Sequence, residues 1–422
     1  MHPTLWRHAD FMKLWTGQTV SRLGSVVTRT AIPLVAILLL GAGPTEMALL
    51  VVAVSLAVLL VGFLAGAWVD RLRRRPLLIA SDVIRALILL SIPVAYFAGV
   101  LTMAQLYLVM FAEACLASVF DAAYPAYVPT LVGTERVVDA NSKLATSSSI
   151  AEIGGPGLAG ALVQFISAPF AILVDAASFV VSAIALVVIR SPEPARPRRT
   201  TATPIHLEIL EGLQLVRRHR VLFPIALRSV IAHVAGSFYG VLYTLFLIND
   251  LHLDPFLLGV VISAGGVGSL LGSFVAAQVI RRLGLGRAFI WTAVGAAAVG
   301  ILTPLAQGPL VLATAMVLVP QLVGDGLQTV EGVAELSLIQ GQTPDRILGR
   351  VNATFEVLTH GFAYPIGALI AAAVAESFGV RVGIAIGWAG MALSIVPLVL
   401  SPLMRIRHAT EQLASSEEIA RG

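Results

Sequence analysis

Polar side chains recur along one face of the apolar run over residues 14–40. The four of them are spaced i, i+4, i+7 and i+11, which is one side of a helix: Gln18, Arg22, Ser25 and Arg29. A charge inside a bilayer costs at least about 2.5–3.5 kcal/mol, so each arginine needs a partner, a cavity or a function. We expect this face to line the interior of a helix bundle, where Gln18 and Ser25 are candidates for contact with a small molecule.

Two carboxylates in other apolar runs could neutralise these arginines. At 1.5 Å of rise per residue, Arg22 lies roughly 13 Å into its run, Glu152 roughly 12 Å and Glu113 roughly 15 Å into theirs. We therefore expect a network of Arg22, Arg29, Glu113 and Glu152. Desolvation and nearby arginines act in opposite directions on a carboxyl group, so one of these acids could exchange a proton for a substrate. The alternative is a set of permanent ion pairs that only fixes helix packing.

A second polar stripe follows the run over residues 309–336. Its members are Gln321, Asp325, Gln328 and Glu335, with Glu331 adjacent. Asp325 is the deepest acid and the candidate for proton coupling in the second half of the chain. Gln328 and Glu331 are candidates for the wall of a substrate cavity. Solvation near the membrane surface is the alternative for Glu331 and Glu335.

The run over residues 224–249 carries two further candidates for the substrate cavity, His233 and Phe238. A histidine titrates near neutral pH, but a lone one in an apolar run is more often a hydrogen-bonded packing residue, and packing is also the alternative for Phe238. Asp175, Glu356 and His360 are assigned no role beyond structure. We expect neither a metal site nor a cofactor.

These residues belong to a very apolar chain. Of its 422 residues, 57% are hydrophobic and 12% are charged, and the mean hydropathy is +0.89. Soluble domains carry about 25% charged residues, so an ordinary soluble enzyme is excluded. The apolar residues form runs of about 20, the length that crosses a hydrocarbon core. The sequence therefore predicts an all-α, multi-pass protein of the cell membrane that retains its first span.

Twelve membrane-spanning helices are predicted in two groups of six. Their ranges are 14–40, 47–68, 77–98, 104–125, 147–166, 169–189, 224–249, 256–280, 288–306, 309–336, 355–375 and 380–402. A cytoplasmic linker, 190–222, joins an N-terminal half, 1–189, to a C-terminal half, 223–404, which a tail, 405–422, follows. The second part of the linker has helical spacing and is expected on the membrane surface. Of 28 Lys and Arg residues, 23 lie in the tails and alternate joins, which places both termini in the cytoplasm.

An internal repeat supports the division into halves. At a spacing of 210 residues, Glu135-Arg136 falls on Asp345-Arg346, and each half then enters a span with proline and glycines, GGPGLAG and AYPIGAL. Two six-helix halves around a central cavity are typical of transporters, with the substrate near the midplane.

Several motifs resemble those of a known family. The stretch GAWVDRLRRRP resembles the loop motif of the major facilitator superfamily, carried here by Gly66, Asp70, Arg71, Arg74 and Arg75. The stretch GPGLAG resembles a motif of its proton-coupled antiporters, carried by Gly155, Pro156 and Gly160. FMKLWTGQTVSRLG, SDVIRA and PDRILGRV resemble the subgroup that contains macrolide efflux proteins and the enterobactin exporter. The resemblance covers nearly the whole chain.

The resemblance implies a major facilitator fold, alternating access and a gating role for the loop. Its aspartate and arginines would join the two halves on the cytoplasmic side: Asp70 would meet the amino end of span 11, where exposed amides favour an anion. Arg71 or Arg74 would pair with Asp121. The proline and glycines of the fifth span would bend it and allow close packing that seals the cavity, the alternative being packing alone. Two features depart from the family pattern: Arg73 replaces a glycine, and Glu113 stands where many antiporters have an arginine in span 4.

No enzyme chemistry is visible in the sequence. Neither lysine lies in a phosphate-binding loop, and the zinc-protease and serine-hydrolase motifs are missing. The sequence predicts a secondary active transporter, a proton-coupled exporter (antiporter) of drug-like or amphipathic small molecules. The alternatives are a specific metabolite or siderophore exporter, a lysolipid flippase, and a transport-inactive sensor or scaffold. Its expected partners are the small-molecule substrate, protons and the lipid bilayer; it is expected to be a monomer and to bind no nucleic acid.

Overall fold

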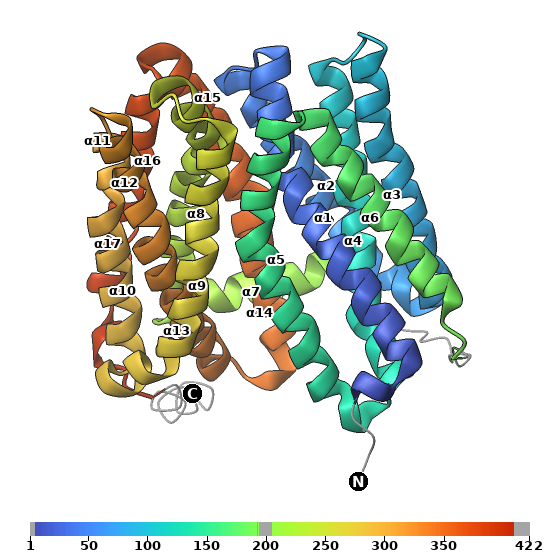
Figure 1. The fold of residues 1–422 in the computed structure, drawn as a ribbon. Helices are drawn as coiled ribbons and strands as arrows, with labels where there is room; N and C mark the ends of the chain where they lie inside the picture. Colours follow the sequence, from blue (N-terminus) through green and yellow to red (C-terminus); the bar gives the residue numbers. More distant parts are fainter. Residues whose placement is uncertain (1–4, 192, 194–204, 409–422) are drawn as a thin grey trace. The chain divides into compact units, whose positions relative to one another are not determined.

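The structure, a computed structural model, describes residues 5–191, 193 and 205–408, except for the side chains of residues 63–71 and 205–209. All regular structure in these residues is helical (Figure 1). The chain divides into two compact units. The first comprises Met1–Ala202 with Asp254–Ser263, and the second comprises Thr203–Leu253 with Ala264–Gly422.

The first unit contains six long helices and the start of a seventh. They are α1 (Ala9–Leu40), α2 (Pro44–Arg71), α3 (Arg74–Phe97), α4 (Met103–Val132), α5 (Val137–Phe165) and α6 (Ala168–Val188). α1 packs on α5 and α6, α2 packs on α4, and α3 packs on α4 and α6. A cluster of buried side chains that includes Phe11, Leu78 and Tyr127 fills the end of the unit where α1 begins.

Local signals fix where these helices begin and end. His8 Nδ1 accepts a hydrogen bond from Phe11 N at 3.1 Å, which caps the first turn of α1. Gly41 ends this helix with a left-handed backbone, at a φ of 65°. Thr102 Oγ1 caps α4 by accepting a hydrogen bond from Gln105 N at 3.3 Å.

The second unit contains more broken helices. They are α7 (Ile205–Arg218), α8 (Leu222–Leu245), α9 (Pro255–Leu283, from Ala264 on), α10 (Leu285–Gly300), α11 (Leu302–Leu305), α12 (Leu310–Val319), α13 (Asp325–Gln342), α14 (Asp345–Glu356), α15 (Tyr364–Phe378), α16 (Val380–Leu393) and α17 (Val396–Val399). α8 packs on α15 and α16, and α10 packs on α13. Three π-helical segments, all in this unit, interrupt the spans: Phe246–Asp250, Pro320–Gly324 and Val357–Ala363. No local pattern in the sequence predicts these π-helical segments.

The predicted membrane class is confirmed. Within the described residues, 11 helices or helical runs are long and apolar enough to cross a membrane, and each coincides with a predicted span. The remaining predicted span, 147–166, lies in α5, which has 29 residues but is more polar.

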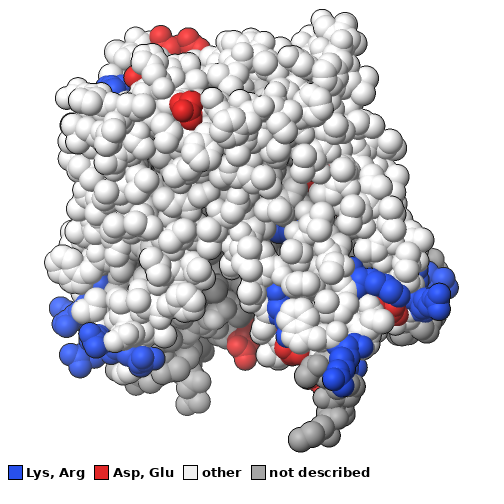
Figure 2. Space-filling model, in the orientation of Figure 1, with Lys and Arg blue, Asp and Glu red and all other residues white. Residues whose placement is uncertain are grey.

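The Lys and Arg side chains of each unit gather toward one end of its helices. Figure 2 shows them in the first unit near the start of α1, and in the second unit near the end of α9, which carries Arg281 and Arg282 in its last turn. This clustering has the pattern that the alternate joins of the sequence predict. The cytoplasmic location of these ends remains a prediction.

The linker helix α7 packs on another helix of the second unit, α14. Arg350 of α14 forms an ion pair with Glu211. A Cβ atom at Gly212 would lie 2.6 Å from the carbonyl oxygen of Arg350, so the two helices are in close contact. The helix is where the sequence predicted it, but its docking on α14 was not foreseen.

Glycines allow α9 to approach the π-helical turn and α13 closely. A Cβ atom at Gly272 would lie 2.9 Å from the carbonyl carbon of Gly326, and one at Gly268 would lie 2.8 Å from that of Leu322. Because the neighbours are backbone atoms, they cannot yield as a flexible side chain would.

We expect Gly272→Leu to lower the free energy of unfolding by about 1–3 kcal/mol, since the new side chain must force α9 away from α13. Equilibrium unfolding in mixed detergent micelles measures the change. Gly332→Leu is the matched control, because nothing lies within 4 Å of a Cβ atom at that position. Equal losses in the two variants would contradict this packing.

Candidate functional site

One acid of the first unit is held between two arginines. Arg22 Nη2 donates to Glu152 Oε1 at 3.1 Å, and Arg29 pairs with the other oxygen of the same carboxylate. The arginines lie two turns apart on α1, so they bracket Glu152 of α5. The Arg22, Arg29 and Glu152 side chains are 48%, 63% and 33% exposed, so protein atoms cover this cluster only in part. The structure therefore brings these three predicted residues together.

The expected place of Glu113 in that network is wrong. Glu113 of α4 pairs instead with Arg85 of α3, whose Nε donates to Glu113 Oε1 at 3.0 Å. The Arg85 guanidinium also lies over the ring of Phe179, 4.0 Å from its centroid. Arg85 was visible in the sequence as a charge inside an apolar run, but it was not considered as a partner.

The polar residues on one face of α1 contact two different helices. Gln18 Nε2 donates to Ser182 Oγ of α6 at 2.8 Å, whereas Arg22 and Arg29 turn to α5. Ser25 is half-buried. Gln18 thus joins two helices of the first unit, and its predicted contact with a substrate is untested.

The second unit has its own buried charge cluster. Arg228 of α8 pairs with Glu331 of α13, and its Nη1 lies 3.7 Å from Glu335 Oε2. Ser229 Oγ donates to the same Glu335. Arg228 and Glu331 are 8% and 3% exposed, so solvation at a membrane surface, the alternative role for these acids, is wrong for Glu331.

A cavity of about 330 Å³ lies beside this cluster, within the second unit. Helices α8, α10, α13 and α16 and the π-helical turn before α13 form its walls. Tyr239, Tyr243 and Trp388 give it aromatic surfaces, and Gln321, Gln328, Asp325, Glu331 and Arg228 supply polar groups. Three of the predicted residues, Asp325, Gln328 and Glu331, therefore line one cavity.

His233 and Phe238 are outside the residues that line this cavity. His233 Nδ1 and the carbonyl oxygen of Ser229 are 2.7 Å apart, and the imidazole meets His360 edge-on with 4.7 Å between the ring centroids. Phe238 is 3% exposed and lies against Gly387 of α16. These contacts agree with packing, the alternative role for both residues, and their contact with a substrate stays a prediction.

Asp325 lines the cavity without a counter-ion among the described residues. No described residue forms an ion pair or a hydrogen bond with its carboxylate, which lies against Gly265 of α9. It follows directly on the π-helical turn Pro320–Gly324, which also presents Gln321 to the cavity. Insertions of this kind are frequent at functional sites. The cavity thus combines aromatic walls with one uncompensated carboxyl group.

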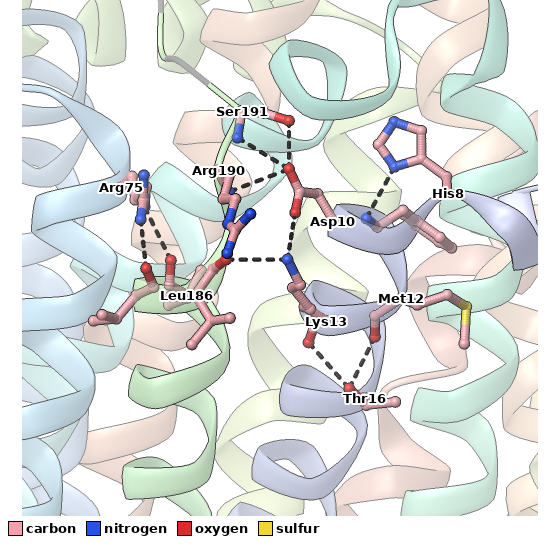
Figure 3. A network of polar contacts seen from close by, with 12 residues as sticks. His8, Asp10, Met12, Lys13, Thr16, Arg75, Leu186, Arg190 and Ser191 are labelled. Carbon is pink, nitrogen blue, oxygen red and sulfur yellow. Dashed lines mark hydrogen bonds and ion pairs between the residues drawn. The ribbon is translucent and has the colours of Figure 1, made fainter.

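The first residues of α3 and the last residues of α6 hold each other in place. Arg75 donates hydrogen bonds from Nε to the carbonyl oxygen of Leu186 at 2.9 Å and from Nη2 to that of Val187 at 2.8 Å. Figure 3 shows Arg75 beside Leu186. Lys13 Nζ, which is paired with Asp10, donates to Val188 O at 3.0 Å. In return, Glu193 accepts hydrogen bonds from the backbone amides of Arg74 and Arg75, at 2.8 and 3.2 Å.

The gating role expected of the loop motif stays a prediction. The side chains of Gly66, Asp70 and Arg71 lie outside the described residues. Arg74 donates to the carbonyl oxygen of Ala126 in α4 and does not form the expected pair with Asp121, which is exposed. The Arg74 side chain joins the start of α3 to α4, and the Arg75 side chain joins it to the end of α6, because both donate to backbone carbonyl groups.

The small residues of α5 permit two close helix contacts in the first unit. Gly155 lies against Val26 of α1. A Cβ atom at Gly160 would lie 3.1 Å from the Cα atom of Gly259, in the first turns of α9. Ser263 Oγ accepts a hydrogen bond from Gly157 N at 2.9 Å. Pro156 is buried between these positions. Whether this packing seals a cavity remains a prediction.

Comparison with known proteins identifies the family. The model for the family described as Major Facilitator Superfamily matches residues 14–367. The chain belongs to the Major Facilitator Superfamily. Its fold agrees with solved structures of this superfamily fold: a bacterial homologue of the iron transporter ferroportin in an inward-facing state (TM-score 0.76, 20% identity, 94% of this chain and 99% of that one) and the nucleoside transporter NupG (TM-score 0.75, 13% identity, 92% and 98%). The predicted fold is confirmed, and the chain is a transporter, not an enzyme.

Two bacterial relatives are similar over most of this superfamily member. An uncharacterized MFS-type transporter of Bacillus subtilis, YvqJ, is 26% identical over 321 residues, which is 73% of this chain and 72% of the relative. The multidrug efflux pump Tap of Mycolicibacterium fortuitum is 27% identical over 372 residues, 85% of this chain and 87% of the relative. The narrower resemblance to macrolide and enterobactin exporters stays a prediction.

The described part of this transporter contains no group of three or more His, Cys, Asp or Glu side chains that could hold a metal ion. Its charged side chains within the spans include ion pairs and acids, such as Asp325, without a counter-ion among the described residues. Such an arrangement can bind and release protons, or balance the charge of a ligand.

The two ion-pair clusters should differ in their contribution to stability because they differ in burial. We expect Arg228→Gln to lower the free energy of unfolding by about 3–5 kcal/mol, since it strands buried carboxyl groups. Glu152→Gln should cost less than about 1 kcal/mol, because its arginine partners are exposed. Equilibrium unfolding in mixed micelles compares the two variants, and similar losses in both would refute the distinction.

Proposed function

We propose that this transporter is a proton-coupled exporter of amphipathic small molecules, working by alternating access. The observation that carries the proposal is the cavity of the second unit, in which Asp325 meets the aromatic side chains of Tyr239, Tyr243 and Trp388. Its volume, about 330 Å³, lies in the range of pockets that hold small organic ligands. The similarity to a protein named a multidrug efflux pump supports the same function.

The walls of the cavity favour an amphipathic ligand. Aromatic rings and small residues such as Ala296, Ala297 and Gly300 offer apolar contact, and few polar groups fix an orientation. Arg228 is already paired with Glu331, so the charge left for a ligand is that of Asp325. A cationic group could balance this carboxylate over the tyrosine rings.

Proton coupling follows from the cost of an unpaired charge. A carboxylate held away from water without a partner is unfavourable, so Asp325 must take up either a proton or a cationic ligand. Competition between the two would exchange protons for substrate. In the first unit, Glu152 with Arg22 and Arg29, and Glu113 with Arg85, are further candidates for proton binding.

The loop motif supplies the proposed gate. By resemblance to the superfamily, Asp70 would approach the amino end of span 11 in the outward-open state, and Gly66 and Arg71 would shape and support the loop. Asp121 is exposed and is free for a loop arginine in that state. The described contacts of Arg74 and Arg75 make them anchors of the loop.

Expression in a bacterial host that lacks its own efflux pumps tests the proposed substrate class. We expect the wild-type chain to raise the lowest growth-inhibiting concentrations of several amphipathic drugs, and Asp325→Asn to return them to those of the empty host. Asp139→Asn is the control, because this acid is 53% exposed at the start of α5. Unchanged drug susceptibility with the wild-type chain would favour a specific metabolite, siderophore or lysolipid transporter instead.

Substitution of Asp70 tests the gate. We expect Asp70→Asn to insert normally but to slow drug-driven proton flux in proteoliposomes by about tenfold, which corresponds to about 1.4 kcal/mol of lost stabilisation of one state. Arg73→Gly, which restores the glycine of the motif, should keep the wild-type rate. Normal flux through Asp70→Asn would refute the gating role.

A further inference from the structure

Asp82 is a carboxyl group that neither the ion pairs nor the cavity uses. It lies in α3, its side chain is 0% exposed, and neither of its oxygens forms a hydrogen bond with a described residue. The great majority of buried polar groups have a partner, and an ionised carboxylate without one is very costly. The protonated, neutral form of Asp82 is therefore the one that this buried position favours.

The helices packed against α3 carry three further acids that interact with Arg85. They are Glu113 and Asp121 of α4 and Asp175 of α6. Asp175 accepts a hydrogen bond from Ser178 Oγ at 2.9 Å. Arg85, three residues after Asp82 on α3, lies within electrostatic reach of Asp82, Asp121 and Asp175. Arg22 of α1 is a second cation within reach of Asp121.

The neighbouring hydroxyl does not replace a cation. Ser182 of α6 lies beside Asp82, and its Oγ accepts a hydrogen bond from Gln18 Nε2 at 2.8 Å. A hydroxyl group can orient a carboxyl group, but it cannot balance a full negative charge in a buried place. The charge of Asp82 can thus be compensated only by a proton or by Arg85.

Arg85 can neutralise either Asp82 or Glu113, but not both at the same time, because it carries a single positive charge. In this structure its Nε and Nη2 both donate to Glu113. Residues spaced i and i+3 lie on the same face of a helix, so Asp82 is the other acid within reach of this side chain. With Arg85 committed to Glu113, Asp82 is the one that must carry a proton.

We propose that Asp82 and Glu113 are alternative proton-binding sites that share Arg85, an inference that rests on the proposed proton coupling and adds a residue to it. In the state seen here, Asp82 is protonated and Glu113 is the carboxylate paired with Arg85. When Glu113 gains a proton, Arg85 turns to Asp82, whose O–H bond breaks and whose proton leaves. The net charge of the three groups is zero in both states.

The difference in exposure gives this exchange a direction of access. The side chain of Glu113 is 16% exposed, whereas Asp82 is sealed. Protons from outside the unit therefore reach Glu113 in the state described here, and the proton on Asp82 can leave only after the helices around it have moved. This arrangement links one proton-binding step to a conformational step.

Infrared spectroscopy of the purified full-length protein in lipid tests the proposal without any substrate. At neutral pH we expect Asp82→Asn to lose the C=O stretch of one protonated carboxyl group that the wild type shows. Glu113→Gln should lose the same band, because its neutral side chain releases Arg85 to Asp82. Glu113→Asp, which keeps a carboxylate, and Glu152→Gln, whose arginine partners lie on α1, should retain it.

Two results would overturn the proposal: no difference between the wild type and Asp82→Asn, or retention of the band in Glu113→Gln. If Asp82→Asn does not fold, the comparison of Glu113→Gln with Glu113→Asp decides by itself. Expected spectra without any drug export would refute only the proposed function. Export with wild-type spectra in all variants would refute only the sharing of Arg85.

Discussion

The cost of an unpaired charge in a water-poor interior governs the arrangement of this transporter. Each arginine within a membrane span is placed where a carboxylate can reach it: Arg22 and Arg29 on Glu152, Arg85 on Glu113, and Arg228 on Glu331. Because these pairs join different helices, they fix which helices can be neighbours and how far along each other they can slide. Asp82 and Asp325, whose carboxyl groups form neither an ion pair nor a hydrogen bond with a described residue, are then positions at which protonation can change with the state of the transporter.

Close packing supports these pairs through residues without bulk. Gly155 and Gly160 bring α5 against α1 and the start of α9, and Gly268 and Gly272 bring α9 against the chain around Asp325. Between helices in a bilayer, van der Waals contact and hydrogen bonds supply most of the attraction, so short approach distances matter more than in water. The backbone that carries Asp325 is consequently fixed by close contact with α9 on both sides of this residue.

Much of the fold could be predicted from the sequence, because long apolar runs, caps and the pattern of Lys and Arg are local signals. Depth along each helix also predicted that Glu152 would meet Arg22 and Arg29. The same argument was wrong for Glu113, because depth in the membrane does not predict which helices are neighbours. Glu113 pairs with Arg85 of α3, the helix that packs on α4. The π-helical turns and the docking of α7 on α14 depend on tertiary contacts, so no local sequence pattern predicts them.

The exchange of contacts between α3 and α6 has a consequence for synthesis of the protein. The first turn of α3 is capped by Glu193, a residue that is made about 120 positions later. Arg75 and Lys13 likewise gain their acceptors, the last carbonyl groups of α6, only when that helix has been made. The start of α3 therefore stays open until the ribosome has passed the sixth span. The contacts between α3 and α6 can therefore form only after all six helices of the first half have been made.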